Sequence, residues 1–178
     1  MHNFKRVCAL ILTVIMLISL CACGSSQKEV VLDVFAPNQS LGIVSTLVAS
    51  YHKVQPNVTM RITYDSGAML AAKIEAGYNC DIFIADDTYF LDWLDKAADT
   101  SINVNGNDRI YSDSRRNEVL VGPADEEYAT EEGMLALYSI AVVKPSTNRA
   151  VSEAFINYFL GESADEVYEE WGFARYTE

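Results

Sequence analysis

Apolar residues after position 29 recur with two different periods, and these periods take turns along the chain. Some stretches are apolar at every second residue or in a short unbroken run, which is typical of strands. Others are apolar at every third or fourth residue, which is typical of helices. We expect strands at 30–35, 58–64, 81–85, 118–121 and 135–143. We expect helices at 40–53, 68–76, 88–97, 149–160 and 163–171, with glycine ending three of them at positions 77, 161 and 172.

The order of these elements predicts the fold class. Strands that alternate with helices of this length are typical of right-handed βαβ units around a parallel sheet. The chain has 178 residues, half of them apolar, which is enough for one domain with its own core. The sequence therefore predicts an α/β protein with a single lobe at 30–178, built on a mostly parallel sheet flanked by helices.

The N-terminus has the features of a targeting segment. Lys5 and Arg6 precede a 14-residue apolar run at 7–20, which is short for a membrane span of about 20 residues. The run ends in Leu-Cys-Ala-Cys-Gly and resembles the bacterial lipoprotein signal, in which cleavage precedes a cysteine that is then acylated. A buried core helix is the alternative, but the run is not amphipathic. We expect a signal peptide at 1–22, lipidation of Cys23, a tether at 23–29 and a location on the extracytoplasmic face of the cell membrane.

Charge and cysteine content limit which binding partners and which covalent cross-links the chain can have. Loss of residues 1–22 would leave 156 of the 178 residues, with 11 Lys plus Arg against 25 Asp plus Glu, a balance near −14. Such an acidic surface makes nucleic acid an improbable partner. Only Cys80 would remain as a free thiol, which excludes a disulfide framework and predicts a buried, inert cysteine.

Two serines stand where predicted strands run into predicted helices. In a parallel sheet, ligands bind outside the carboxyl ends of the strands, and both Ser40 and Ser66 fall there. A helix N-terminus offers unpaired N–H groups and a partial positive charge, a serine adds a hydroxyl donor, and Gly67 permits close approach of a ligand. Serine is also among the best N-cap residues, and a cap stabilises its helix by about 1 kcal/mol without any ligand. Both interpretations stay open on the residues alone.

Other combinations of reactive residues favour no catalytic chemistry. Asp86 and Asp87 could hold a metal, but an aspartate that caps the following helix explains them better, so we expect no metal site. His52 would be the single histidine after cleavage, which leaves no histidine-based triad. The chain has neither a Gly-x-Ser-x-Gly elbow nor a phosphate-loop motif. We expect neither an enzyme nor a cofactor.

Several of these motifs together resemble a known family. They are Ser40-Leu41 after the first strand, Ser66-Gly67-Ala68-Met69 after the second, Ile74 to Gly77, and Asp81 to Asp87. In this order they resemble the first lobe of bacterial molybdate-binding proteins, the solute receptors of ABC transporters, and residues 138–173 resemble the family's ending. The resemblance implies a periplasmic-binding-protein-like fold, a molybdate or tungstate ligand at Ser40, Ser66 and Gly67, and an ABC transporter permease as partner.

The chain departs from that family in two places. Only a short connector, 122–134, stands where the family has a second lobe, so we expect half of a two-lobed site and weak binding. Asp65 replaces a small neutral residue, and its carboxylate would repel a dianion unless it turned outward. Two functions therefore remain open. One is a solute-binding lipoprotein with a weakened oxyanion half-site; the other is an interaction module that uses the exposed face to bind another protein or a second copy of itself.

Overall fold

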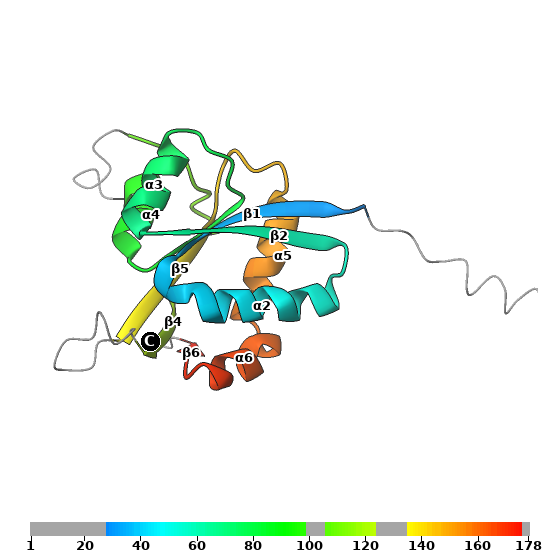
Figure 1. The fold of residues 1–178 in the computed structure, drawn as a ribbon. Coiled ribbons are helices and arrows are strands. Elements are labelled where there is room, and N and C mark those ends of the chain that lie inside the picture. The colour runs from blue at the N-terminus through cyan, green and yellow to red at the C-terminus, as the bar shows by residue number, and fades with distance from the viewer. Residues whose placement is uncertain (1–27, 99–105, 124–134, 176–178) are drawn as a thin grey trace, which may run out of the picture.

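The first half of the chain folds into the predicted series of strands and helices. The computed structural model describes residues 28–98, 106–123 and 135–175. Each of the first three strands leads into a helix, as the apolar pattern predicted (Figure 1). The elements are β1 (Val30–Pro37), the 3-10 turn η1 (Asn38–Ser40), α2 (Leu41–Val54), β2 (Val58–Asp65), α3 (Gly67–Glu75), β3 (Ile82–Ala85) and α4 (Thr88–Leu94).

The second half completes the sheet with strands of the opposite direction. Its elements are β4 (Arg116–Pro123), β5 (Leu135–Val142), α5 (Arg149–Leu160), η2 (Glu162–Ala164), α6 (Asp165–Glu170) and β6 (Ala174–Arg175). The sheet order is β2-β1-β3-β5-β4-β6. β1 pairs in parallel with β2 and β3, whereas the β3–β5, β5–β4 and β4–β6 pairs are antiparallel. The α/β class is confirmed, but the sheet is mixed rather than mostly parallel. Only eleven residues join β4 to β5, and parallel strands need a crossover of about a dozen or more.

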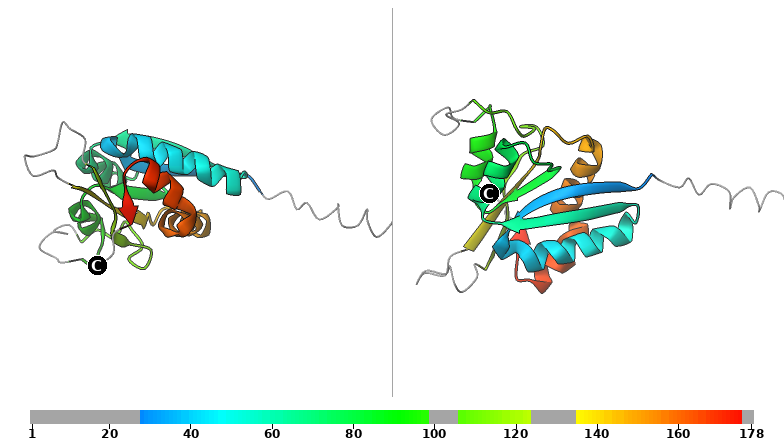
Figure 2. Two further views of the ribbon diagram at one scale, coloured as in Figure 1. Left: turned by 90° about the horizontal axis from the view of Figure 1, so that it is seen from below. Right: turned by 45° about the horizontal axis from the view of Figure 1, so that its top comes forward.

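Helices cover both faces of the sheet. Alternate residues of β1 point to opposite faces: Val34 packs with α2, α5 and α6, whereas Phe35 packs with α3 and α4 (Figures 1 and 2). Each face of the sheet thus has its own apolar core. The core beneath α2, α5 and α6 is the larger and includes the aromatic residues Tyr51, Phe155, Phe159 and Tyr168. Because both faces are buried, β3 is apolar at every position, which explains its unbroken sequence Ile-Phe-Ile-Ala.

Most predicted boundaries hold within two residues, and α5 matches its prediction at both ends. The exception among the helices is α4, which ends at Leu94 rather than at 97. The Asp95 carboxylate accepts hydrogen bonds from the N–H of Ala97 and the hydroxyl of Ser112, and so holds the chain in a turn. The two-residue strand β6 was not predicted.

The remaining sequence predictions concern either the termini or the free thiol. Signal peptide 1–22, Cys23 and connector residues 124–134 lie outside the described residues. Within the described part, no helix combines the length and apolarity needed to cross a membrane. Cys80 is buried, as predicted, and burial raises the pKa of its thiol well above the ordinary value.

Candidate functional site at the carboxyl edge of the parallel strands

Strand register brings the predicted site segments to one edge of the sheet. β1 and β2 end level with each other, with Pro37 beside Asp65. β3 lies on the other side of β1 and runs in the same direction. The turns that follow these three strands are 38–40, 66–67 and 86–87, and each leads into a helix. They meet at the left-hand ends of β1 and β2 in Figure 1. This edge is where parallel sheets bind ligands.

Ser40 does not present its hydroxyl at this edge. The side chain is completely buried, and its Oγ donates a hydrogen bond of 2.8 Å to the carbonyl oxygen of Pro37. It also makes no capping bond to α2, although it occupies the N-cap position. In this structure the hydroxyl proton is used inside the protein, where it closes the η1 turn after β1.

Ser66 is exposed at the N-terminus of α3, and its geometry permits both roles that the sequence left open. Its Oγ accepts a long hydrogen bond of 3.4 Å from the N–H of Met69, which is an N-cap. A hydroxyl has one proton to donate and two lone pairs to accept with, so the cap leaves the proton available to a ligand. The N–H groups of Gly67 and Ala68 belong to the first turn, where a helix has no internal acceptor for them.

The carboxylate of Asp65 is paired with a lysine and with a backbone N–H. One carboxylate oxygen lies 2.7 Å from Nζ of Lys73, and the other accepts the N–H of Ser66 at 2.9 Å. The hydrogen bond from Lys73, followed by that from Ser66, lowers the pKa of Asp65 below its ordinary value. The carboxylate thus stays ionised and paired with Lys73 of α3. The positive charge of Lys73 locally offsets the repulsion between Asp65 and an incoming anion.

Asp86 and Asp87 differ in their partners. The sequence predicts that an aspartate caps α4, and Asp87 is that cap, through the N–H of Tyr89 at 2.8 Å. Asp86 instead turns towards the carboxyl edge, where its Oδ2 accepts a hydrogen bond of 2.6 Å from Nε2 of Gln39. Among the residues that the structure describes, nothing hydrogen-bonds to its other oxygen, Oδ1, which is shielded from solvent.

The same carboxylate packs against Gly67. A Cβ at this position would lie 2.5 Å from Oδ1 of Asp86 and 2.6 Å from Cε2 of Phe90. The side of Gly67 on which a Cβ would stand is therefore filled by the protein's own side chains. Glycine is needed here because Asp86 and Phe90 pack against the first residue of α3.

Large apolar side chains surround this edge. Leu41, Met69 and Tyr89 stand in the first turns of α2, α3 and α4 and are 54%, 52% and 50% exposed. Trp171 reaches the same end of α2, where its indole packs on Gly42 and its Nε1 donates to Oγ1 of Thr46 at 3.2 Å. Leu41, Met69 and Tyr89 therefore leave apolar surface open to solvent at the starts of these three helices.

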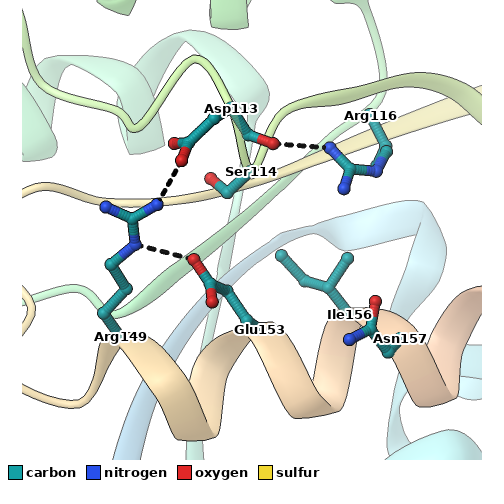
Figure 3. A pocket seen from close by; sticks show the side chains of 7 residues that line it. All are labelled: Asp113, Ser114, Arg116, Arg149, Glu153, Ile156 and Asn157. Atoms are coloured by element: carbon teal, nitrogen blue, oxygen red, sulfur yellow. Dashed lines mark hydrogen bonds and ion pairs between the residues drawn. The ribbon is translucent and has the colours of Figure 1, made fainter.

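A separate cavity of about 290 Å³ lies between α5 and the segment before β4. Arg149 bridges Asp113 and Glu153 there, at 2.5 and 2.6 Å, and Arg116 donates to the backbone carbonyl of Asp113 (Figure 3). Arg149 also stacks on Tyr111, with its guanidinium carbon 4.0 Å from the ring centroid. These charges are used in joining α5 to the loop, which is a structural role.

The described residues include no group of three His, Cys, Asp or Glu side chains placed to hold a metal.

Comparison with known proteins gives the fold. No protein-family model and no curated protein sequence matches the chain. Among solved structures, the substrate-binding domain of a molybdenum ABC transporter from Clostridium difficile matches with a TM-score of 0.65 and 16% identity, over 84% of this chain and 100% of that one. The periplasmic molybdate-binding protein of Azotobacter vinelandii matches with a TM-score of 0.62 and 12% identity, over 82% and 100%. A sulfate-binding protein from Mycobacterium tuberculosis matches with a TM-score of 0.60 and 9% identity, over 83% of this chain and 87% of that one.

These similarities define a class of fold. The chain has the fold of the periplasmic solute-binding proteins, as its sequence resemblance implied. The three neighbours are named for two different solutes.

Proposed function

We propose that this protein is a solute-binding receptor of the ABC transporter type, which binds a tetrahedral oxyanion such as molybdate or tungstate and does not transform it. The fold supports the class of protein, and the neighbours' solutes suggest the class of ligand. The observation that carries the proposal is the start of α3, where an exposed serine hydroxyl stands at the carboxyl edge beside first-turn N–H groups that have no acceptor within the helix.

The chemistry of that site suits a small anion. Ser66 offers an O–H, and Gly67 and Ala68 offer N–H groups, without adding charge to the site. A hydrogen bond to a charged partner contributes about 1.5–3 kcal/mol. Three such bonds on one open lobe give modest affinity, because a second set of donors from a facing lobe and the exclusion of water would both be lacking. We expect weak binding.

Isothermal titration of the purified protein with molybdate, tungstate and sulfate tests this function. Saturable binding of at least one anion supports it. Ser66→Gly is the matched control, because glycine is nearly as good a cap as serine but has no hydroxyl. This variant should bind the same anion about tenfold more weakly at unchanged fold, as expected for loss of one such hydrogen bond. Absence of binding heat with all three anions at millimolar concentration would contradict the proposal.

The receptor would be anchored by lipid at Cys23 on the extracytoplasmic face, with an ABC transporter permease as its partner. The support is the N-terminal motif in the sequence. Cys23→Ala should block acylation and leave uncleaved precursor, which a shift in intact mass detects. A variant that matures and fractionates with membranes like the wild type would contradict the anchor.

A second candidate function rests on the exposed apolar residues at the same edge. Leu41, Met69 and Tyr89 would be covered if this face packed against another protein or a second copy of the chain. Sedimentation analysis of the wild type and of a Leu41→Asp, Met69→Asp protein distinguishes these cases. Association that the double substitution abolishes would favour an interaction module, whereas a monomer at all concentrations would remove self-association.

A further inference from the structure

We propose that the outer side of β2 is an interface, through which two copies of this chain pair antiparallel and join their sheets into one. The inference goes beyond the proposed function, because it concerns the outer side of β2 and not the carboxyl edge of the sheet. The partner that it names is a second copy of the same chain.

β2 ends the sheet on one side with a long, regular strand. It pairs with β1 over all eight of its residues in one continuous register, and no described strand lies beyond it. Edge strands in natural proteins are usually short, bulged or interrupted by proline, because an open edge is a template for another strand. The opposite edge of the sheet is short, since β6 has two residues. β2 is neither short nor bulged, and Pro56 stands before it.

The pairing with β1 determines which backbone groups of β2 face outward. Val30 stands beside Val58, and its N–H donates to the carbonyl oxygen of Asn57 at 2.9 Å. In a parallel pair, alternate residues point both backbone groups at the neighbouring strand. The odd-numbered residues of β2 therefore face β1, and the even-numbered residues face away from the sheet.

Met60, Ile62 and Tyr64 present backbone groups that are open to a further strand. The outward groups of Val58 are already used: its N–H donates to a carbonyl in the preceding turn at 3.0 Å, and its carbonyl oxygen lies 3.0 Å from Nδ1 of His52. Among the described residues, no such partner reaches the outward N–H and C=O groups of the other three. They are spaced by two residues, as the hydrogen-bonding groups of a strand must be.

One register satisfies all of these groups at once. If Ile62 lies opposite Ile62 of a second copy in an antiparallel pair, then Met60 lies opposite Tyr64 of that copy. Each of these is a hydrogen-bonded pair, in which both residues exchange N–H···O bonds. The arrangement is symmetric under a two-fold rotation, so it closes as a dimer and leaves neither β2 edge open.

The side chains fit the same register on both faces of the joined sheet. On the face towards α2, the even-numbered side chains are apolar and partly buried, and pairing would cover more of their surface. On the other face, Arg61 would stand opposite Thr63 of the second copy, and Thr59 opposite its Asp65. No like charges stand directly opposite each other, which is the arrangement that destabilises cross-strand pairs. The edge therefore complements itself, which favours a second copy over an unrelated strand.

Sedimentation equilibrium of the purified protein between about 1 μM and about 1 mM tests the inference. The wild type should pass from monomer to dimer within this range. Met60→Pro removes an N–H that faces away from β1, and proline is tolerated on an edge strand at such a position. This variant should dimerise at least about tenfold more weakly, because each copy loses a hydrogen bond to the other. Its melting curve checks the fold.

The exposed threonines test the register with substitutions that leave the backbone intact. Thr63→Lys would face Arg61 of the second copy and should weaken the dimer, whereas Thr63→Glu should strengthen it. At Thr59, which would face Asp65, the signs reverse: Thr59→Lys should strengthen the dimer and Thr59→Glu should weaken it. Each change should be about threefold or more, because the pair occurs twice in a dimer.

Three results would overturn the inference. The first is a monomer at every concentration. The second is association that the β2 substitutions leave unchanged, or that Leu41→Asp, Met69→Asp abolishes instead. The third is a charge effect of the same sign at Thr59 and Thr63. Titration of Met60→Pro with molybdate is a separate measurement and should match the wild type, so failure of anion binding and failure of dimerisation are distinguishable.

Discussion

Asp81 and Asp86 stand at the two ends of the same buried strand, β3, and their surroundings differ. Asp81 is 7% exposed, and both of its oxygens have partners. Its Oδ2 accepts the N–H of Asp33 at 2.7 Å, and its Oδ1 accepts from the hydroxyl of Ser146 at 2.5 Å and from Nδ2 of Asn148. Asp86, at the carboxyl end, has one oxygen held and one without a partner.

This difference distinguishes a carboxylate with complete hydrogen bonding from one whose hydrogen bonding is incomplete. Buried polar groups in native proteins are nearly always hydrogen-bonded, so an exception calls for an explanation. The amino end of β3 is closed by a satisfied network that ties β1 to the segment before α5. The carboxyl end, where parallel sheets bind ligands, has a carboxylate with one unpartnered oxygen beside the start of α3. The comparison assigns Asp81 to the stability of the fold and leaves Asp86 with a smaller part in it.

The largest predicted effect tests that assignment through stability. Asp81→Ala removes three hydrogen bonds to a charged group and leaves the partly buried N–H of Asp33 without its acceptor. The free energy of unfolding should fall by about 3 kcal/mol. Asp86→Ala should change it by less than about 1 kcal/mol, because the lost bond to Gln39 is offset by removal of the unsatisfied oxygen. Urea unfolding measures both values. Equal losses in the two variants would erase the distinction.

A medium effect is expected where Asp86 meets α3. Gly67→Ala places a methyl group against Asp86 and Phe90, and such overpacking costs about 1–3 kcal/mol. The double variant Gly67→Ala, Asp86→Ala removes one of the two clashes. Its loss of stability should therefore be smaller than the sum of the single losses, as a double-mutant cycle shows. Strict additivity would mean that the carboxylate does not fill this space.

The smallest effect concerns the cap at Ser66. Its hydrogen bond to Met69 is long, so Ser66→Ala should lower the free energy of unfolding by about 0.5 kcal/mol, the low end for a cap. Ser66→Gly should lower it by only a few tenths. Anion binding should weaken alike in both, because both lack the hydroxyl. A variant that loses stability but no affinity would make Ser66 a cap alone.

The apolar periods in the sequence were enough to predict the elements, and the βα order was enough to predict the class of fold. The C-terminal end of α5 was predicted because Gly161 follows its last apolar position. Strand direction after β3 was not predictable in this way. The pattern of an apolar strand is the same in a parallel and an antiparallel pair. The available signal was the short link between β4 and β5, which indicates an antiparallel pair.

The candidate site was only half predictable. The sequence was enough to predict the carboxyl edge of the sheet as the site and Ser66 as one of its residues, because Ser66 comes directly after a predicted strand. The contact of Asp86 with Gly67 joins residues 19 positions apart, through the packing of α3 beside α4. No periodicity reports such a contact. The burial of Ser40 was missed for a similar reason, since one turn of 3-10 helix rotates its side chain inward.

The central claim is that a small oxyanion binds at the start of α3, and amide NMR titration tests it most directly. Phosphate and molybdate are added separately to ¹⁵N-labelled protein, and backbone shifts are followed residue by residue. The account predicts saturable shifts at Gly67, Ala68 and Met69, with Asn148 at the opposite edge unmoved as the internal control. Saturable shifts centred elsewhere, or none at the start of α3 with either anion, would contradict it.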